Sequence, residues 1–112
     1  MYARQLVNLK HINLMGCPWV TDELIGKLVS ASQLSSANFY NTNIASHAAN
    51  YLKSAHQLKA LNLGATRIKG GYIKDLVNDL KLLRKLSLKN LNGQVMSPGN
   101  LPKQTIFNKN MF

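Results

Sequence analysis

Four stretches of the chain share one pattern of apolar and polar positions. Each begins with leucine, continues with two variable residues, and then places two apolar residues on either side of one further variable residue. The stretches are LKHINLMGC from Leu9, LSSANFYNT from Leu34, LKALNLGAT from Leu58 and LRKLSLKNL from Leu83. Their starts lie 25, 24 and 25 residues apart. A constant spacing of this size indicates an internal repeat.

The paired apolar positions of each stretch predict a short β-strand. They alternate with period two, which places both side chains on one face of a strand. The pairs are Ile12/Leu14, Ala37/Phe39, Leu61/Leu63 and Leu86/Leu88. The residue inside each pair is polar in all four repeats, namely Asn13, Asn38, Asn62 and Ser87. We expect this row to point away from the core.

The segments between the strands predict helices, because their apolar residues recur at helical spacing. The first helix begins with Thr21 or Asp22 as its N-cap and buries Leu24, Ile25, Leu28 and Val29. The second is capped by Ser46 and buries Ala48, Ala49, Tyr51, Leu52 and Ala55. The third follows a turn at Gly70 and Gly71 and buries Ile73, Leu76, Val77 and Leu80.

Strands and helices that alternate with a constant period predict an α/β solenoid. Parallel strands would line its concave face, helices would cover its convex face, and residues 1–92 would hold about three and a half repeats. An ordinary doubly wound α/β domain also alternates strand and helix, but it imposes no constant period. Residues 93–112 show neither period. We expect this irregular tail to cap the last repeat or to dock on a neighbouring subunit through Ile106, Phe107 and Phe112.

The stretch LKHINLMGCPWVTDELIGKL, from Leu9 to Leu28, resembles the leucine-rich repeat family. It is closest to the cysteine-containing subtype of F-box substrate receptors, whose repeats run Leu-x-x-Leu-x-Leu-x-Gly-Cys and then apolar-Thr-Asp. The slot that the family fills with Cys or Asn holds Cys17, Thr42, Thr66 and Leu91. Small polar groups there can bond the turn backbone, and Leu91 departs from the pattern. The resemblance covers about residues 6–92 and implies the solenoid, a protein-binding surface and, as one alternative, F-box-type substrate recognition.

Small mitochondrial proteins similar to ATP synthase coupling factor B also carry a few such repeats, and the length of this chain is closer to theirs. That likeness implies a mitochondrial location. The chain begins at most eight residues before its first strand and contains no F-box. We therefore expect another chain, or further sequence of a longer protein, to cover the outer edge of the strand at Leu9–Leu14.

The charge of the chain indicates an anionic partner. Lys and Arg together number 14 against 4 for Asp and Glu, which gives a net charge of +10. Since charged residues are 16% of the chain, compared with about 25% in average domains, the imbalance reflects a shortage of acids. The partner could be RNA, an acidic protein or a lipid surface. The tightest basic cluster, and the candidate contact for RNA or another anion, is Lys81, Arg84, Lys85 and Lys89.

Composition also bounds the location of the chain. No apolar run approaches the ~18 residues of a membrane span, and the N-terminus lacks the apolar core and cleavage site of a secretory signal. Cys17 is the single cysteine, so an internal disulfide is excluded. These features predict an intracellular protein in a reducing compartment.

The sequence predicts no catalytic, metal or cofactor site. The acids Asp22, Glu23, Asp75 and Asp79 all fall on the predicted helices, and the three histidines lack metal-ligand spacing. Cys17 and His11 could form a nucleophile pair, but the repeat slot explains the cysteine. In GATRIKGG, residues 64–71, the lysine precedes the closing glycines, unlike a phosphate-binding loop.

The outward positions of the predicted sheet are the candidate protein-binding residues. They include His11, Asn13, Met15, Asn38, Tyr40 and Asn62, with Tyr40 as the natural anchor. The alternative is that the asparagines pair with one another along the ladder or simply solvate this face. The sequence thus predicts a non-enzymatic protein-interaction or scaffold subunit of a larger assembly. The alternative is an RNA-contacting subunit of a ribonucleoprotein such as an organellar ribosome.

Overall fold

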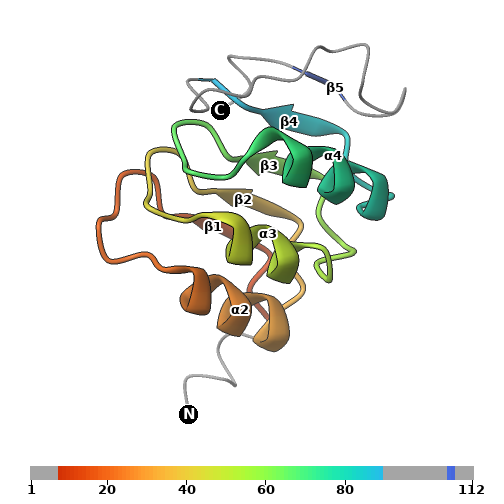
Figure 1. The fold of residues 1–112 in the computed structure, drawn as a ribbon. Coiled ribbons are helices and arrows are strands. Elements are labelled where there is room, and N and C mark those ends of the chain that lie inside the picture. The colour runs from red at the N-terminus through yellow and green to blue at the C-terminus, as the bar shows by residue number, and fades with distance from the viewer. Residues whose placement is uncertain (1–7, 90–105, 108–112) are drawn as a thin grey trace.

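The computed structural model describes residues 8–89 and the short segment 106–107. One parallel sheet contains β1 (His11–Asn13), β2 (Ser36–Asn38), β3 (Ala60–Asn62), β4 (Lys85–Ser87) and β5 (Ile106–Phe107), in chain order. The helices α2 (Asp22–Ala31), α3 (Ser46–Leu52) and α4 (Gly70–Asp79) lie beside one another on one face of this sheet (Figure 1). The predicted α/β class, the four strands and the three helices are confirmed.

The strand register places equivalent residues of the repeats directly beside one another. His11 pairs with Ser36, Ser36 with Ala60, and Ala60 with Lys85. One row further on lie Asn13, Asn38, Asn62 and Ser87. A property that recurs every 24 or 25 residues in the chain therefore becomes a row that crosses the sheet at right angles to the strands.

The hydrophobic core lies between the sheet and the helices. The apolar pairs of β2, β3 and β4 are buried, whereas Ile12 and Leu14 of the first repeat are only partly buried. On the helical side the fully buried side chains include Ile25, Leu52, Ile73 and Leu76. Leu24 and Val29 of α2 are partly buried, like the apolar residues of β1. The core is therefore least enclosed at the end of the sheet that β1 forms.

The starts of α2 and α3 are stabilised in different ways. Thr21 is the N-cap of α2, as predicted, and its Oγ1 accepts a hydrogen bond from the backbone N–H of Leu24 at 3.2 Å. The prediction for Ser46 is wrong, because Ala45 is the N-cap of α3 and makes no side-chain cap bond. The N–H of Ala45 instead donates to Oδ1 of Asp22 at 2.8 Å. A carboxylate of one repeat thus holds the helix start of the next.

Replacing Thr21 by alanine is expected to lower the free energy of unfolding by about 1 kcal/mol, since the Leu24 N–H loses its capping oxygen. The matched Ser46→Ala variant is expected to change it by less than about 0.5 kcal/mol, because Ser46 caps nothing and alanine favours a helix. Urea unfolding followed by far-UV circular dichroism measures both. Equal losses in the two variants would contradict the assignment of the caps.

Two further expectations about the helices are corrected. Gly70 and Gly71 form the first turn of α4 instead of a turn before it. Tyr51 is 41% exposed and so does not belong to the core. Its ring lies over Gly26 of α2, where an added Cβ would stand 3.0–3.1 Å from three ring carbons. Tyr51 therefore covers the contact between α2 and α3 from the solvent side.

Part of the C-terminal segment returns to the sheet. The sequence shows no strand period there, yet Ile106 and Phe107 form β5, in register with Lys85 and Leu86. Phe112, the third residue proposed for docking, and Leu91 lie outside the described residues. In the part of the chain that the structure describes, no helix has the length and apolarity needed to cross a bilayer.

Candidate protein-binding surface

The face of the sheet opposite the helices is the candidate binding surface, since no helix of the described residues covers it (Figure 1). Its outward positions differ in exposure. Exposed side chains come from the two outer repeats, namely His11, Asn13, Met15, Lys85 and Lys89. Ser36, Tyr40 and Ala60 are half-buried, and Asn38, Asn62, Gly64 and Ser87 are buried. The middle of this face is therefore largely closed to a partner.

The asparagine row is a structural element of the sheet. Oδ1 of Asn13 accepts from the N–H of Met15 at 3.0 Å, and Oδ1 of Asn38 accepts from the N–H of Tyr40 at 3.0 Å. In the third repeat, Oδ1 of Asn62 accepts from the N–H of Gly64 at 2.9 Å.

These bonds correct the predicted role of the asparagines. Asn38 and Asn62 are only 7% and 5% exposed, so neither offers its amide to a partner. The alternative, that the asparagines bond to one another along the ladder, is also wrong, because each one bonds its own strand two residues further on. The row stabilises the ends of the strands, where an unpaired backbone N–H would otherwise destabilise a buried site.

The turn after each strand is held by a second side chain. Oγ1 of Thr42 donates to the carbonyl of Phe39 at 2.9 Å, and Oγ1 of Thr66 donates to the carbonyl of Leu63 at 2.8 Å. The prediction that small polar residues at this slot bond the turn backbone is confirmed for both threonines. Cys17 occupies the same slot in the first repeat and is half-buried. Its own N–H donates to the carbonyl of Leu14 at 3.1 Å.

Tyr40 lies across the neighbouring strand instead of standing away from the sheet. Its ring covers Gly64, where an added Cβ would be 2.8 and 3.0 Å from two ring carbons. Glycine at this slot therefore makes room for the ring. The half-buried ring can offer a flat aromatic surface to a partner without losing much conformational entropy on binding. The structure thus keeps Tyr40 as a candidate contact residue, with a fixed orientation.

The exposed apolar residues of the surface gather after β1. Met15 is 55% exposed and Trp19, in the following loop, is 61% exposed. Met15 occupies the same slot as Tyr40, and the N–H of Gly16 donates to the Tyr40 carbonyl at 2.8 Å. We call Met15, Trp19 and Tyr40 the apolar edge.

Trp19 was absent from the residues predicted from sequence. The motif GCPW was interpreted only as a turn, although a tryptophan placed after proline in a loop offers no obvious path into the core. A large apolar side chain exposed to solvent is more informative than an exposed polar one. The tryptophan within the turn is the signal that could have identified it.

The predicted basic cluster is divided between the two ends of β4. Lys89 follows the strand, about 16 Å from Arg84 by the rise per residue. The register instead aligns Arg84 with residues of earlier repeats. The N–H of Arg84 donates to the Lys59 carbonyl at 2.8 Å, that of Lys59 to the Ser35 carbonyl at 2.7 Å, and that of Ser35 to the Lys10 carbonyl at 2.6 Å. Lys81 and Lys85, both exposed, lie near Arg84 in the chain.

This alignment creates a row of positive charge at the starts of the strands. We call Lys10, Lys59 and Arg84 the strand-start row, and all three are exposed. His11, next to Lys10, is fastened to the neighbouring strand by a hydrogen bond of 2.7 Å between its Nδ1 and Oγ of Ser36. Sequence proximity did not reveal the row, because its members lie in three different repeats.

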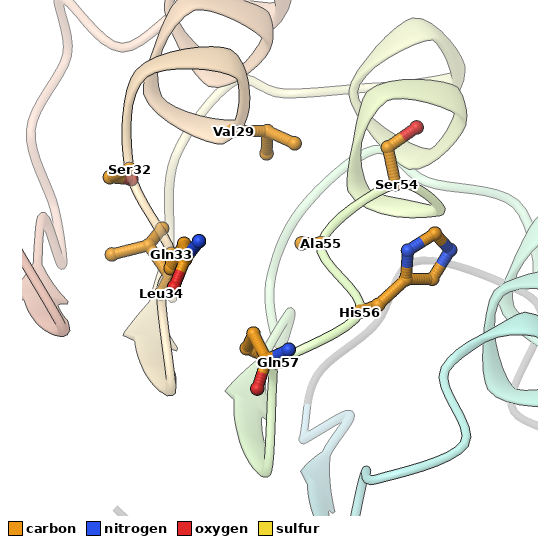
Figure 2. A pocket seen from close by; sticks show the side chains of 8 residues that line it. All are labelled: Val29, Ser32, Gln33, Leu34, Ser54, Ala55, His56 and Gln57. Atoms are coloured by element: carbon orange, nitrogen blue, oxygen red, sulfur yellow. The ribbon is translucent and has the colours of Figure 1, made fainter. Parts of the chain in front are cut away.

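A cavity of about 190 Å³ opens beside the strand-start row. Figure 2 shows that it lies between the connection from α2 to β2 and the connection from α3 to β3. Its aliphatic lining comes from Val29, Leu34 and Ala55, and its polar lining from Ser32, Gln33, Ser54, His56 and Gln57. The cavity offers apolar contact together with neutral hydrogen-bonding groups.

Among the residues that the structure describes, no three or more histidine, cysteine or acidic side chains gather in a way that could hold a metal ion. Asp22 uses Oδ1 for the N–H of Ala45. The exposed chemistry of the open face is apolar, aromatic and basic, which suits recognition of another molecule.

No protein-family model matches the chain, and a search of curated proteins finds no match. Among solved structures, the fold is similar to one described as the leiomodin-1 actin-binding site 2, with a TM-score of 0.66 and 16% sequence identity. The similarity covers 85% of this chain and 64% of that one. At this identity the likeness concerns the fold alone, and the chain spans less than two thirds of the structure it matches.

Proposed function

We propose that the chain is a non-enzymatic protein-interaction module that serves as a subunit of a larger assembly and binds its partner through the apolar edge. The observation that carries this proposal is the exposure of Met15 and Trp19, 55% and 61%, beside Tyr40 on a rigid sheet. Aromatic residues and methionine are enriched in protein interfaces. The hydrogen bonds of the asparagine row hold the backbone under two of these residues, so little order must be gained on binding.

We also propose that the fold is a short leucine-rich repeat solenoid. The spacing of 24 or 25 residues between paired strand positions supports it, as does the alignment of equivalent slots across the sheet. The bonds that Thr42 and Thr66 make in successive turns fit the role of that slot in the repeat. Solenoids of this kind use an open face as an extended binding surface.

The structural neighbour supports a protein-binding use of this fold, because its description names an actin-binding site. Actin is therefore the first purified protein to test with this chain. The likeness does not extend to individual contact residues, since the two sequences are 16% identical. The proposal for the apolar edge depends on the residues of this chain.

Site-specific photo-crosslinking in cells of the source organism tests the proposal. A benzophenone amino acid at Met15 is expected to give discrete adducts with one or a few proteins, because this side chain is 55% exposed at the proposed contact. A benzophenone at Tyr72, which is 37% exposed on α4, is the matched control on the helical side and is expected to give none of these adducts. Adding the Trp19→Ala substitution is expected to reduce the Met15 adducts at least about fivefold, since interface anchors contribute 1–2 kcal/mol or more.

Identical adducts from Met15 and Tyr72 would contradict the proposal, because they would show contact without a preferred face. Nuclease-sensitive adducts at Met15 would instead support the ribonucleoprotein alternative. Co-sedimentation with purified actin filaments, with and without Trp19→Ala, then tests actin itself as the partner.

A further inference from the structure

We propose that the strand-start row and the neighbouring cavity form a second docking site, which binds an acidic protein segment carrying an aliphatic side chain between its acidic residues. This site lies at the starts of the strands, whereas the apolar edge lies at their ends. The inference takes from the proposed function only that the partner is a protein. Failure of either site can therefore be recognised while the other still binds.

The geometry of the row fits an extended segment that crosses the strands. Neighbouring strands lie about 4.8 Å apart, so Lys10 and Lys59 stand about 10 Å apart, with Ser35 between them, and Arg84 lies one strand beyond Lys59. Three residues of an extended chain span about 10 Å. Acidic residues separated by three positions can therefore reach Lys10 and Lys59, while a longer acidic run also reaches Arg84.

The cavity opens at the one neutral position of the row. Gln33 comes two residues before Ser35, and Gln57 comes two residues before Lys59, so both lining segments lead directly into the row. The lining by Val29, Leu34 and Ala55 suits a branched aliphatic side chain, and a volume of about 190 Å³ can hold one. The amides of Gln33 and Gln57 are placed to bond the backbone of a bound segment (Figure 2).

The charges of the row are available for a partner. No basic side chain within residues 8–89 forms an ion pair with another described residue. The carboxylate closest to the row in sequence is that of Asp79, the last residue of α4, and it is exposed. Lys81 and Lys85, also exposed, outnumber it on this side. The edge therefore keeps a positive field that attracts an acidic segment.

A protein segment fits this site better than single-stranded RNA does. Proteins that bind single strands stack bases on aromatic side chains beside the basic groups. The exposed aromatic residues of the open sheet face belong to the apolar edge, at the far ends of the strands. The cavity beside the row is lined by aliphatic and amide groups, with His56 as its single aromatic ring.

Fluorescence anisotropy with a labelled glutamate peptide that carries one central leucine tests the site. The triple variant Lys10→Ala, Lys59→Ala and Arg84→Ala is expected to weaken binding at least about tenfold, because it removes three charge contacts. The control variant Lys27→Ala, Lys74→Ala and Arg67→Ala removes the same charge from exposed residues elsewhere and is expected to change binding less than about twofold. Replacing the central leucine of the peptide by serine is expected to weaken binding at least about threefold.

Equal losses in the two triple variants would overturn the proposal, because they would show attraction by the overall charge alone. Equal binding of the leucine and serine peptides would overturn the role of the cavity. An oligouridine RNA that binds more tightly than the peptide and depends on the row would overturn the choice of a protein partner. Circular dichroism confirms that all variants keep the native fold.

Discussion

The Gly64→Ala variant is expected to lose about 3 kcal/mol of folding free energy, the cost of forcing extra volume into a closely packed site. A Cβ at this position would lie 2.4 Å from the backbone carbonyl of Lys89 and 2.8 Å from the ring of Tyr40. The ring can move, but the carbonyl cannot, since it accepts a hydrogen bond from the N–H of Ala65 at 2.9 Å. The methyl group must therefore push β4 away from β3. Thermal unfolding followed by circular dichroism should show a Tm lowered by more than about 10 °C.

Two variants separate this effect from a general intolerance of alanine. Gly71→Ala adds a Cβ in α4 where no atom lies within 4 Å, so it is expected to raise the stability by about 0.5 kcal/mol. The double variant Tyr40→Ala with Gly64→Ala is expected to remain as unstable as Gly64→Ala, because the Lys89 carbonyl is still in place. Recovery in the double variant would show that the ring, and not the backbone of β4, makes the glycine necessary.

Removal of the Asn62 amide is expected to destabilise the protein by about 2 kcal/mol, within the range for leaving a buried donor unpaired. In Asn62→Ala the N–H of Gly64 loses its acceptor at 2.9 Å, in a place where both residues are buried. Water has little access to replace that acceptor. Urea unfolding is expected to show a lower midpoint with an unchanged m-value.

Asn13→Ala removes the same bond from the first repeat, where Asn13 and Met15 are both exposed. Water can then take over the Met15 N–H, so the expected loss is less than about 1 kcal/mol. The two variants differ in burial and share the same chemistry. Losses of equal size would show that the row acts through local strand conformation instead of through burial.

The sequence was sufficient for the fold class because its information is local and repeated. The period-two pairs, such as Leu61 and Leu63, and the helical stripes around Ile25 and Leu76 each specify one element. The constant spacing then predicts which strands lie side by side. The exceptions concern the ends of elements. Ser46 looks like a cap in sequence, but Asp22 of the preceding repeat binds the N–H that needed an acceptor.

The binding surface was less predictable, because exposure and alignment depend on neighbours. An asparagine on the open face can bond its own backbone or a partner, and the sequence does not distinguish these uses for Asn38 and Asn62. The strand-start row depends on register across three repeats, so a search for adjacent charges found Arg84 with Lys85 and overlooked Lys59. Trp19 was overlooked because a turn residue seldom attracts attention as a contact.

The order of the strands has a consequence for how the chain folds. β1 to β4 pair in chain order, and each pairing joins residues 24 or 25 positions apart. The loop entropy lost in forming each pairing is therefore nearly the same, and it depends only slowly on loop length. No pairing among these strands must wait for a distant part of the chain. Since Ile12 and Leu14 are the least buried strand pair, the first repeat gains least from closure. Folding can begin between the central repeats and spread outward, with β1 the last of these strands to join and the first to open.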